Sequence, residues 1–342
     1  MSLDVLIVGA GPAGLCAAWE AQQRGWLPVL LERGAGPGGV WSRVPGEMRC
    51  LSPRRRDLLP DGSSPPGSSE RARAAEVLAA LEDFASRLDM DCRFGTEAER
   101  LEIAEAGELI VHTRTEAFET RRLVIATGEY DRPVLPSLPG IASASAVHSS
   151  DFDTSRVGPG DHVLVVGARA SASDLVERLL ALDASITLSA RGPLLTQPKM
   201  TEGGLRAELL WRASGIPTRL LPRSLRCSEA ILPVDPILED ARLAGHLRVV
   251  GPTVALSEGG VRVEPEGLIE ADHVVFATGY RRDLAWLGRP ALSEEGEVLQ
   301  SGGISTTVPG LAFLGIPCMR TRRSGFLRGL ADDAAAVVGA LA

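Results

Sequence analysis

Apolar and polar positions at the start of the chain follow the order of a β-α-β unit. Residues 3–8 form a short, mostly apolar run bounded by glycine, which predicts a buried parallel strand. Residues 9–24 carry apolar side chains at helical spacing, and residues 28–31 predict a second buried strand. The chain therefore opens with the strand, helix and strand of a nucleotide-binding fold.

The same pattern returns about 150 residues later. Residues 162–166 predict a strand, residues 170–182 a helix, and residues 186–189 a further strand. Two such units so far apart indicate two nucleotide-binding folds and not a short tandem repeat.

The end of the chain indicates how these two folds are connected. The tail, residues 326–341, predicts a final helix, and if this helix packs on the first unit, the second domain is inserted within the first. We therefore predict an α/β fold with two Rossmann-like dinucleotide-binding domains. Residues 1–132 and 280–342 would form the first domain, and residues 133–279 the second.

The region between the first unit and the second is less regular. Residues 34–68 are rich in Gly, Pro, Arg and Ser, which is typical of a functional loop. Ser69 is the expected start of a helix with an apolar face, and residues 101–113 predict a β-hairpin or meander. Residues 122–126 predict another buried strand.

The first turn carries the motif Gly9-Ala10-Gly11-Pro12-Ala13-Gly14. Gly9 permits a tight turn, Gly11 lets the backbone approach a pyrophosphate, and Gly14 lets helix and strand pack closely. The helix N-terminus then offers N–H groups and the positive end of its dipole to the phosphates. Glu32 follows at the distance where a carboxylate accepts hydrogen bonds from ribose hydroxyls. Strand, helix and acid occur in order, so the pattern predicts a dinucleotide site.

Composition narrows the class of protein. The 342 residues carry a net charge of -8, which disfavours binding to nucleic acid or an anionic membrane. No apolar run of about 18 residues predicts a transmembrane helix, and the N-terminus lacks the pattern of a signal peptide, so a cytoplasmic enzyme is expected. The five cysteines are widely scattered, which argues against a disulfide framework or a zinc site.

The segment Gly38-Gly39-Val40-Trp41 carries a resemblance to a known group of proteins. The chain resembles the two-dinucleotide-domain flavoproteins, and within them the flavin-containing monooxygenase-like group and related small bacterial oxidoreductases. The resemblance includes the motifs Ala126-Thr127-Gly128 and Ala277-Thr278-Gly279-Tyr280, residues 309–315, and residues 320–325 with Arg328, Gly329 and Asp333. It implies FAD as the cofactor of the first domain. The residues expected to bind FAD are Gly9, Gly11, Pro12, Ala13, Gly14, Glu32, Arg33, Gly39, Val40, Trp41, Ala126, Thr127, Gly128, Gly315, Gly325 and Phe326.

The final helix has a specific place in that family, where its N-terminus points at the flavin. Reduced flavin carries negative charge near N1, and a helix N-terminus stabilises an anion by roughly 0.3–2 kcal/mol. Gly325 and Phe326 would lie at that end of the helix.

The segment Gly167-Ala168-Arg169-Ala170-Ser171-Ala172 occupies the place of the family's NADPH motif. Ser171 and Ala172 fit the motif, but Arg169 replaces its middle glycine. An arginine there either blocks the cofactor or turns outward and pairs with a phosphate, and the sequence leaves both interpretations open. Arg191 follows the next strand where an acid would hold a free ribose, so NADPH is expected in preference to NADH.

These features predict an FAD-dependent oxidoreductase that accepts hydride from NADPH and acts on a small molecule, with a monooxygenase as one form. The alternative is an oxidase or dehydrogenase that takes electrons directly from its substrate, and a flavin-binding sensor is a third hypothesis. A homodimer is one of the oligomeric states left open. The family's FxGxxxH fingerprint keeps His148 but has Ala142 and Ala144 at its other positions.

Three further features are candidates for catalysis or recognition. His148 either orients the linker between the domains or is an ordinary structural histidine. Cys50 and Cys318 fall in segments that the resemblance places near the flavin, where they would form a redox pair or serve as buried apolar side chains. The run Arg54-Arg55-Arg56 is expected to be a solvated loop, with recognition of an acidic substrate as the alternative. Residues 51–56 also lack the asparagine that some family members place over the flavin.

Overall fold

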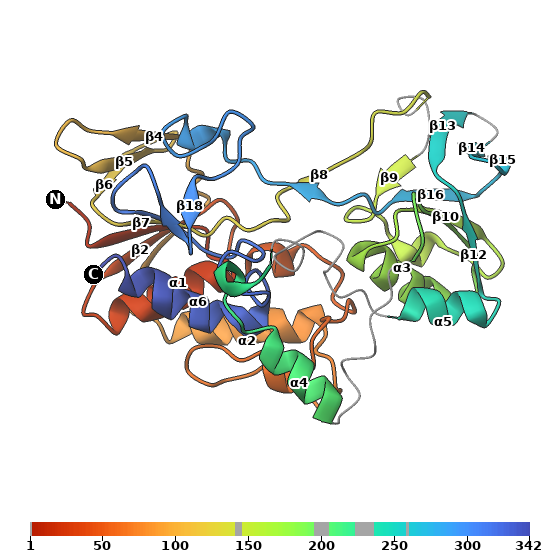
Figure 1. Cartoon of the computed structure of the whole chain (residues 1–342), viewed down its shortest axis with the longest axis horizontal. Coiled ribbons are helices and arrows are strands. Elements are labelled where there is room, and N and C mark those ends of the chain that lie inside the picture. Colours follow the sequence, from red (N-terminus) through yellow and green to blue (C-terminus); the bar gives the residue numbers. More distant parts are fainter. Residues whose placement is uncertain (1, 141–145, 195–204, 223–235, 258–259) are drawn as a thin grey trace. The chain divides into compact units, whose positions relative to one another are not determined.

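The computed structural model describes residues 2–140, 146–194, 205–222, 236–257 and 260–342. These residues form two compact units, each with its own sheet and core (Figure 1). Unit 1 consists of Met1–Asp131, Gly203–Ser228 and Arg282–Ala342, and unit 2 of Arg132–Glu202 and Glu229–Arg281.

Unit 1 is built on a seven-stranded sheet with the order β18-β19-β20-β7-β1-β2-β3. The five strands from β20 to β3 are parallel, and β18 and β19 extend the edge in antiparallel pairing. Every side chain of β1, β2, β7 and β20 is buried, as expected for a parallel sheet covered on both faces. The strands are β1 (Val5–Val8), β2 (Pro28–Glu32), β3 (Asp91–Phe94), β7 (Leu123–Ile125), β18 (Gln300–Ser301), β19 (Ile304–Ser305) and β20 (Leu311–Phe313).

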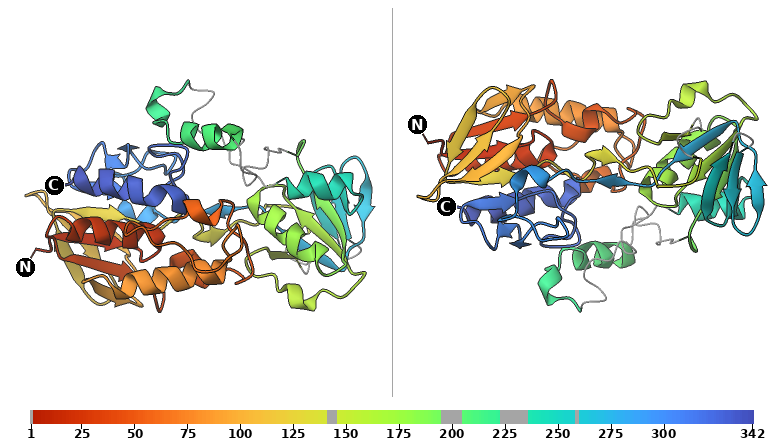
Figure 2. Two further views of the ribbon diagram at one scale, coloured as in Figure 1. Left: turned by 90° about the horizontal axis from the view of Figure 1, so that it is seen from below. Right: turned by 90° about the horizontal axis from the view of Figure 1, so that it is seen from above.

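Two different layers cover this sheet. The helices α1, α2 and α6 lie on one face, and the antiparallel strands β4, β5 and β6 lie on the other (Figures 1 and 2). Apolar residues of both layers join the sheet in one buried core. The bounds are α1 (Pro12–Gln22), α2 (Ala74–Ser86), α6 (Leu327–Gly339), β4 (Arg100–Ile103), β5 (Leu109–His112) and β6 (Ala117–Thr120).

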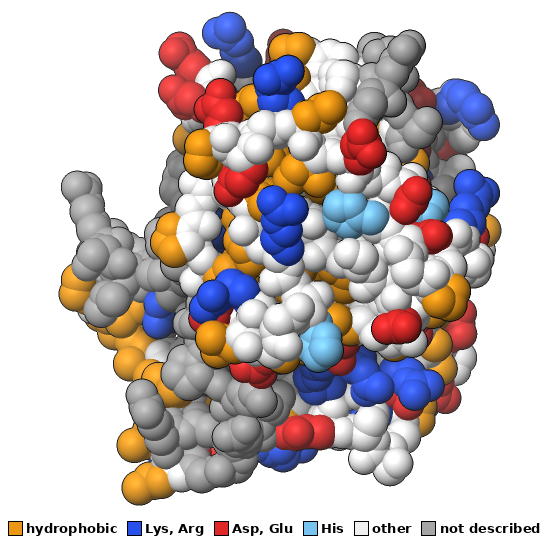
Figure 3. Space-filling view, turned by 90° about the vertical axis from the view of Figure 1, so that its right-hand side faces the viewer, with side chains coloured by type: hydrophobic (Ala, Val, Ile, Leu, Met, Phe, Trp, Pro, Cys, Tyr) orange, Lys and Arg blue, Asp and Glu red, His pale blue; other side chains and the backbone are white. Residues whose placement is uncertain are grey.

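Unit 2 is built on a five-stranded parallel sheet with the order β12-β11-β10-β16-β9. Alternate residues of its central strand enter two separate cores: Val163 and Val165 pack with α3 and α5, whereas Leu164 and Val166 pack with β13–β15. Figure 3 shows acidic and basic side chains interspersed over the face turned to the viewer. The bounds are β9 (Ala146–His148), β10 (His162–Val166), β11 (Ser185–Ser189), β12 (Leu247–Val250), β16 (His273–Phe276), α3 (Ala170–Leu180), α5 (Ile237–Leu243), β13 (Thr253–Ser257), β14 (Gly260–Val263) and β15 (Gly267–Ile269).

Short elements complete the fold. The strands β8 (Arg132–Pro133) and β17 (Tyr280–Arg281) pair where the chain enters and leaves unit 2. Helix α4 is Leu205–Ala213, and no helix in the described residues is long and apolar enough to cross a membrane. The 3₁₀ turns are Gly39–Ser42, Arg54–Arg56, Thr154–Arg156, Thr218–Leu220 and Ala285–Leu287.

The predicted fold class is confirmed, because both parallel sheets and the interrupted first domain are present. Residues 205–222 are grouped with unit 1, although the predicted second domain, residues 133–279, included them. The physical reason is a contact with a distant part of the chain: Trp211 is buried, and its carbonyl accepts a 2.7 Å hydrogen bond from Arg323 Nη2 of the same unit. An amphipathic stretch of sequence does not reveal which of two cores it covers.

The second helix starts later than predicted, at Ala74 and not at Ser69. The Ser69 carbonyl accepts a hydrogen bond from Arg54 Nε at 2.8 Å, and residues 66–71 form bends outside the helix. Arg73 is the N-cap residue, and its backbone N–H donates to Glu76 Oε2 at 2.7 Å. The capping residue is therefore an arginine, for which the sequence offers no recognisable start pattern.

Candidate functional site

The first glycine turn packs too tightly for side chains at two of its positions. Gly9 has φ +105°, and a Cβ there would lie 2.5 Å from the Ala126 carbonyl oxygen. A Cβ on Gly14 would lie 1.8 Å from the Gly9 carbonyl oxygen. Both glycines are therefore required by the backbone itself, as the sequence pattern predicted.

Gly11 differs from its neighbours because space remains beside it. Its φ is −74°, and a Cβ would meet only the Gly39 Cα at 3.7 Å. Helix α1 begins at Pro12, its N-cap Gly11 makes no side-chain capping bond, and its first turn contains no acid. This N-terminus therefore presents N–H groups and dipole to an anion.

Glu32 ends β2 with a buried carboxylate that contacts the same turn. Its Oε2 accepts a hydrogen bond from the Ala10 N–H at 2.8 Å, and its Oε1 accepts one from the Gly34 N–H at 2.7 Å. An ionised carboxylate has about four acceptor positions, so two remain for hydroxyl donors.

The Gly38-Gly39-Val40-Trp41 segment lies against the turn. The Gly38 N–H donates to the Ala10 carbonyl at 2.9 Å, and a Cβ on Gly39 would lie 3.0 Å from the Gly11 Cα. Val40 and Trp41 are half-buried in a 3₁₀ turn, and Trp41 packs against the core of unit 1. Two segments separated in sequence thus lie in contact beside Gly11.

The remaining predicted FAD residues follow the carboxyl ends of neighbouring parallel strands. Ala126, Thr127 and Gly128 follow β7, and the Ala126 N–H donates to the Val8 carbonyl at 2.8 Å. Gly315 follows β20, and a Cβ there would lie 3.1 Å from the Ala13 Cβ. The structure therefore brings these glycines to the edge of the sheet where α1 begins.

Arg33 has acidic neighbours on the same unit. Its guanidinium forms an ion pair with Asp131 and lies 4.0 Å from Glu97 Oε1. Its side chain is 42% exposed, so it remains accessible from solvent. If Arg33 also binds the cofactor, as predicted, its guanidinium would divide its N–H donors between these carboxylates and the ligand.

The segment before α6 is held in a fixed turn. A Cβ on Gly325, with φ +83°, would lie 2.9 Å from the Pro317 nitrogen, and Phe326 is the N-cap residue of α6. The buried Ser324 hydroxyl accepts from the Arg320 N–H at 3.1 Å. Arg320 also pairs with the buried Asp333 at 3.1 Å, and burial raises the pKa of that carboxyl. This network fixes the turn that leads into the final helix.

Unit 2 repeats the geometry of the first turn. Gly167 has φ +120°, and a Cβ there would lie 2.3 Å from the Ala277 carbonyl oxygen. Arg169 is the N-cap residue of α3 with φ −112°, so the backbone at this position does not require glycine. The arginine side chain is exposed, Ser171 is half-buried and Ala172 is buried. No acid stands in the first turn of α3.

The end of β11 carries arginine in place of an acid. Arg191 is exposed just beyond this strand. The buried Ser189 hydroxyl donates to the Gly251 carbonyl at 2.9 Å and accepts from the Thr253 hydroxyl at 2.8 Å. Arg191 therefore places a positive charge just beyond the end of β11.

His148 is a buried structural link within unit 2. Its Nδ1 accepts from the Ser150 N–H at 3.2 Å, and its Nε2 lies 3.1 Å from the Gly279 carbonyl, to which it donates in the matching tautomer. Its ring meets the Tyr280 ring edge-on with 4.9 Å between centroids. Burial lowers the pKa of this imidazole, which keeps it neutral near pH 7. Ala142 and Ala144, at the other fingerprint positions, lie outside the described residues.

The hypothesis of a Cys50–Cys318 redox pair is wrong. Cys50 is a buried free thiol, whereas Cys318 is joined in a disulfide whose other half lies outside the described residues. Burial raises the pKa of the Cys50 thiol, so this group is not a thiolate near pH 7. The scattered cysteines were expected not to form a disulfide framework, and Cys16, Cys50 and Cys92 are free; the single disulfide at Cys318 could not be foreseen, because sequence distance does not measure distance in the fold.

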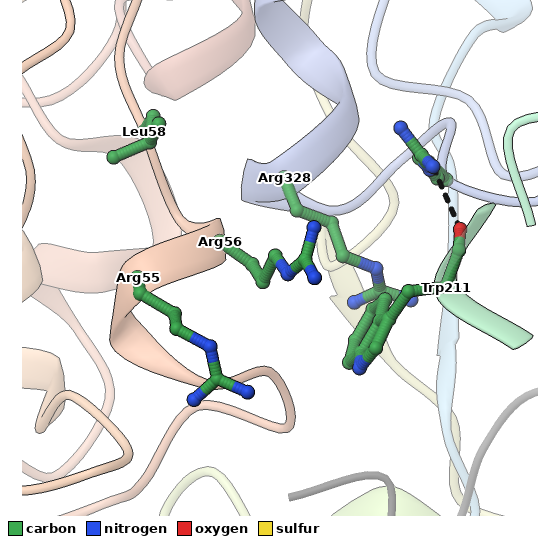
Figure 4. A pocket seen from close by; sticks show the side chains of 6 residues that line it. Arg55, Arg56, Leu58, Trp211 and Arg328 are labelled. Carbon is green, nitrogen blue, oxygen red and sulfur yellow. Dashed lines mark hydrogen bonds between the residues drawn. The ribbon is translucent and has the colours of Figure 1, made fainter. Parts of the chain in front are cut away.

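A pocket that the motifs did not predict lies beside the start of α6 (Figure 4). We call it the arginine pocket. It has a volume of about 180 Å³. All of its lining residues belong to unit 1. They are Arg55, Arg56, Leu58, Trp211, Arg323 and Arg328.

The three arginines of the 54–56 turn have different roles. Arg54 is buried and donates to the Pro65 carbonyl at 2.9 Å, to Ser69 and to Glu76, so it holds the loop together. Arg55 is exposed at the rim, and Arg56 lines the pocket and pairs with Glu208. The expectation of a solvated loop therefore holds for Arg55 alone.

Asp57 is the buried acid behind this pocket. Its Oδ1 accepts a 2.6 Å hydrogen bond from Ser52, and its Oδ2 is buried without a hydrogen-bond partner in the described chain. Burial raises the pKa of this carboxyl to about 6, although Arg328 and Arg54 favour its charged form. Burial likewise lowers the pKa of the Arg328 guanidinium to about 10.

Trp211 was missed by the sequence analysis. It lies in a short helix, and nothing in its spacing connects it to residues 55–58 or 323–328. Arg323 and Arg328 were named only as part of the resemblance. The one available indication was the density of arginines in two separate loops, which solvated loops share.

Two Rossmann-like sheets, each with a glycine turn leading into an uncapped helix, define an oxidoreductase of the two-dinucleotide-binding-domain class. The comparison with protein families identifies the family within this class. Residues 6–206 match the model of the pyridine nucleotide-disulphide oxidoreductase family, so the chain belongs to that family.

Individual relatives are distant but match nearly the whole chain. The "Uncharacterized oxidoreductase CzcO" of Bacillus subtilis is 23% identical over 98% of both chains. The "Indole-3-pyruvate monooxygenase YUCCA1" of Oryza sativa subsp. japonica is 26% identical over 88% of this chain and 81% of its own length.

Solved structures share the fold over the full length. A flavin-containing monooxygenase from Stenotrophomonas maltophilia superposes with a TM-score of 0.80 at 23% identity, covering 99% of this chain and 98% of its own. The bacillithiol disulfide reductase Bdr (YpdA) from Bacillus cereus has a TM-score of 0.76 at 20% identity, covering 100% of this chain and 99% of its own. The fold therefore serves both oxygenation and disulfide reduction in similar proteins.

Proposed function

We propose that this protein is an FAD-dependent oxidoreductase that takes hydride from NADPH, with FAD held by unit 1 and NADPH by unit 2. One observation carries the proposal: the turn at Gly9 against Ala126 and the turn at Gly167 against Ala277 have the same geometry. Each turn leads into a helix without a side-chain cap. When bound, the nicotinamide supplies hydride and the flavin passes the electrons to an acceptor.

The residues of unit 1 fit FAD. The pyrophosphate would lie at the N-terminus of α1 beside Gly11, where a side chain is absent and N–H groups face outward. Glu32 would accept from the ribose hydroxyls with its two remaining acceptor positions. Gly39 would line the groove opposite Gly11, and the start of α6 at Phe326 would stabilise negative charge on the reduced ring.

The residues of unit 2 fit NADPH. Arg169 has a backbone conformation open to any residue, and its side chain is exposed, so it need not fill the phosphate position. Its guanidinium and the N-terminus of α3 would both attract the pyrophosphate. Arg191 would pair with the 2′-phosphate, which distinguishes NADPH from NADH.

We further propose that the protein is a monooxygenase, in which NADPH and oxygen are consumed, one oxygen atom enters the substrate and the other leaves as water. Relatives along 88% of the chain and structures along 99% of it are named as flavin monooxygenases. The buried Cys50, a neutral free thiol, offers no support for disulfide reduction at that position. The alternative is an oxidase or dehydrogenase that acts directly on its substrate, and the replacement of the middle glycine by Arg169 favours it.

The test is anaerobic reduction of the flavin by NADPH, followed as loss of absorbance near about 450 nm. Wild type should bleach with NADPH, and Arg191→Ala should weaken the apparent affinity for NADPH about tenfold while leaving that for NADH unchanged. Arg262→Ala, an exposed arginine of β14 in the same unit, is the matched control. A flavin that NADPH does not bleach would contradict the proposal and favour the direct oxidase.

A further inference from the structure

The arginine pocket gathers positive charge around an aromatic floor. Arg55 and Arg56 come from one 3₁₀ turn, Trp211 from α4, and Arg328 from the first turn of α6 (Figure 4). The Arg328 guanidinium carbon lies 5.0 Å from the centroid of the Trp211 ring and 4.1 Å from that of Phe326. This stacking between two rings holds the guanidinium in place by cation–π attraction.

Several donors in the pocket lack partners. Arg328 Nε and Nη1 and Arg56 Nε are buried, and none has a hydrogen-bond acceptor among the described residues. A buried donor left unpaired costs about 1–3 kcal/mol, and more when it is charged. Arg328 therefore brings unpaired N–H donors to the lining of the pocket, and an anion is the ligand class that would accept from them.

A count of charges indicates how much negative charge the pocket accepts. Arg55 lies 3.9 Å from Glu70, and Arg56 pairs with Glu208, so these two arginines are compensated. Arg323 donates to Ser214 and to the Trp211 carbonyl, both of which are neutral.

Arg328 forms no ion pair within 4.0 Å in the described part of the chain, and the nearby Asp57 offsets about one charge. One net positive charge from Arg323 and Arg328 therefore remains near neutral pH, enough for one singly charged group.

The rest of the lining indicates what carries that group. Leu58 is 44% exposed at the opening, and Trp211 is 4% exposed at the floor. An apolar body would cover Leu58 and contact the indole, which a small inorganic anion cannot do. The volume of about 180 Å³ corresponds to roughly six waters, which suits an acid head group with part of a ring.

We propose that the arginine pocket binds the carboxylate of an aromatic or similarly apolar organic acid, and that this acid is the substrate of the flavin. Arg328 receives the carboxylate, Arg323 adds positive charge, and Trp211 and Leu58 contact the apolar body. Arg328 is two residues beyond Phe326, the N-cap residue assigned to the flavin site, so the acid lies beside the proposed reaction centre. Only its role as substrate rests on the proposed function; binding of the acid does not.

The experiment compares a charged ligand with its neutral counterpart on the FAD-loaded protein. Phenylacetate, 2-phenylacetamide and phenyl phosphate are titrated by calorimetry. Wild type should bind phenylacetate at least tenfold more tightly than the amide, and Arg328→Met should reduce that ratio to within about twofold. Arg121→Met, whose side chain is 76% exposed on the same unit, should keep the wild-type ratio.

A second variant covers the risk that Arg328→Met does not fold. Arg55→Glu changes an exposed side chain at the rim, so the protein should fold, and it should weaken phenylacetate binding at least threefold without affecting the amide.

A wild-type ratio below twofold overturns the proposal. Phenyl phosphate binding tenfold more tightly than phenylacetate overturns the assignment of a carboxylate.

The substrate role has its own readout, because phenylacetate but not the amide should accelerate NADPH oxidation. Acid binding without that acceleration removes the role as substrate and leaves the pocket assignment intact. Failure to take up FAD contradicts the proposed function, while the acid-to-amide ratio can still be measured on the same protein.

Discussion

Gly11 and Gly14 lie three residues apart in one turn, yet substitution by alanine should change different properties at the two positions. It should weaken FAD binding at Gly11 and lower the stability of the fold at Gly14. The backbone at Gly11 has φ −74°, which any residue adopts, and a Cβ there would make an ordinary contact of 3.7 Å with the Gly39 Cα. At Gly14 it would lie 1.8 Å from the Gly9 carbonyl oxygen, which no real Cβ tolerates. Gly11→Ala therefore adds a methyl group to open space beside the turn, whereas Gly14→Ala forces the backbone of the turn to shift.

The expected magnitudes follow from these contacts. Gly11→Ala reduces the entropy of the unfolded chain, which stabilises the fold. It also replaces glycine by a poorer N-cap residue, which destabilises the fold. Because the two effects oppose each other, the free energy of unfolding should change by at most about 1 kcal/mol. Its methyl group would keep the pyrophosphate from the helix N-terminus, and the loss of one or two charged hydrogen bonds should weaken FAD binding about 100-fold. Gly14→Ala should lower the free energy of unfolding by about 3 kcal/mol or more.

The assay measures stability and binding separately. Urea unfolding of the apoprotein, followed by circular dichroism, gives the free energy of unfolding, and quenching of FAD fluorescence gives the affinity. Wild-type FAD affinity in Gly11→Ala would show that the pyrophosphate does not lie at this turn. Equal destabilisation by the two substitutions would show that the space beside Gly11 is not open.

Two further predictions concern the loop behind the arginine pocket. Arg54→Met removes hydrogen bonds to Pro65, Ser69 and Glu76, so the free energy of unfolding should fall by about 2–4 kcal/mol and limited proteolysis should cut within residues 57–70; a loop as resistant as in wild type would contradict the anchoring role. The pKa of Asp57 is raised to about 6, so protonation below this pH removes a negative charge and phenylacetate should bind more tightly at pH 5.5 than at pH 7.5. One unit charge close to the bound carboxylate is worth on the order of 1 kcal/mol, so the affinity should change by about two- to fivefold, and Asp57→Asn should bind tightly at both pH values; titration of wild type without this pH dependence would refute it.

The cofactor turns could be predicted because each of their requirements is local in sequence. A strand, Gly9, Gly11, Gly14 and a helix follow one another within one β-α-β unit, and the acid at Glu32 lies at a fixed distance set by the length of the helix. The same holds for Gly167, where the turn survives although the middle glycine is lost. The φ of −112° at Arg169 shows why: the backbone at that position does not require glycine.

The start of the second helix and the assignment of residues 205–222 could not be predicted, because both depend on partners distant in sequence. The late start of α2 is accompanied by the hydrogen bond between Arg54 and Ser69, which lie fifteen residues apart. The place of α4 follows from Arg323, whose guanidinium donates to the Trp211 carbonyl across 112 residues. The helix propensities of neighbouring residues contain no information about either contact.

The arginine pocket shows the same limit at the level of function. The lining of the pocket comes from three separate stretches of chain, which contain Arg55 and Arg56, Trp211, and Arg323 with Arg328. Each stretch alone resembles an ordinary basic loop or surface helix. Their chemistry arises only when folding removes water from Arg328 and places it between Trp211 and Phe326, where its donors lack partners. A motif that binds a cofactor must keep its spacing because the cofactor is constant. A substrate pocket has no such constraint, so its ligand class can be inferred only from the charges and rings that the fold assembles.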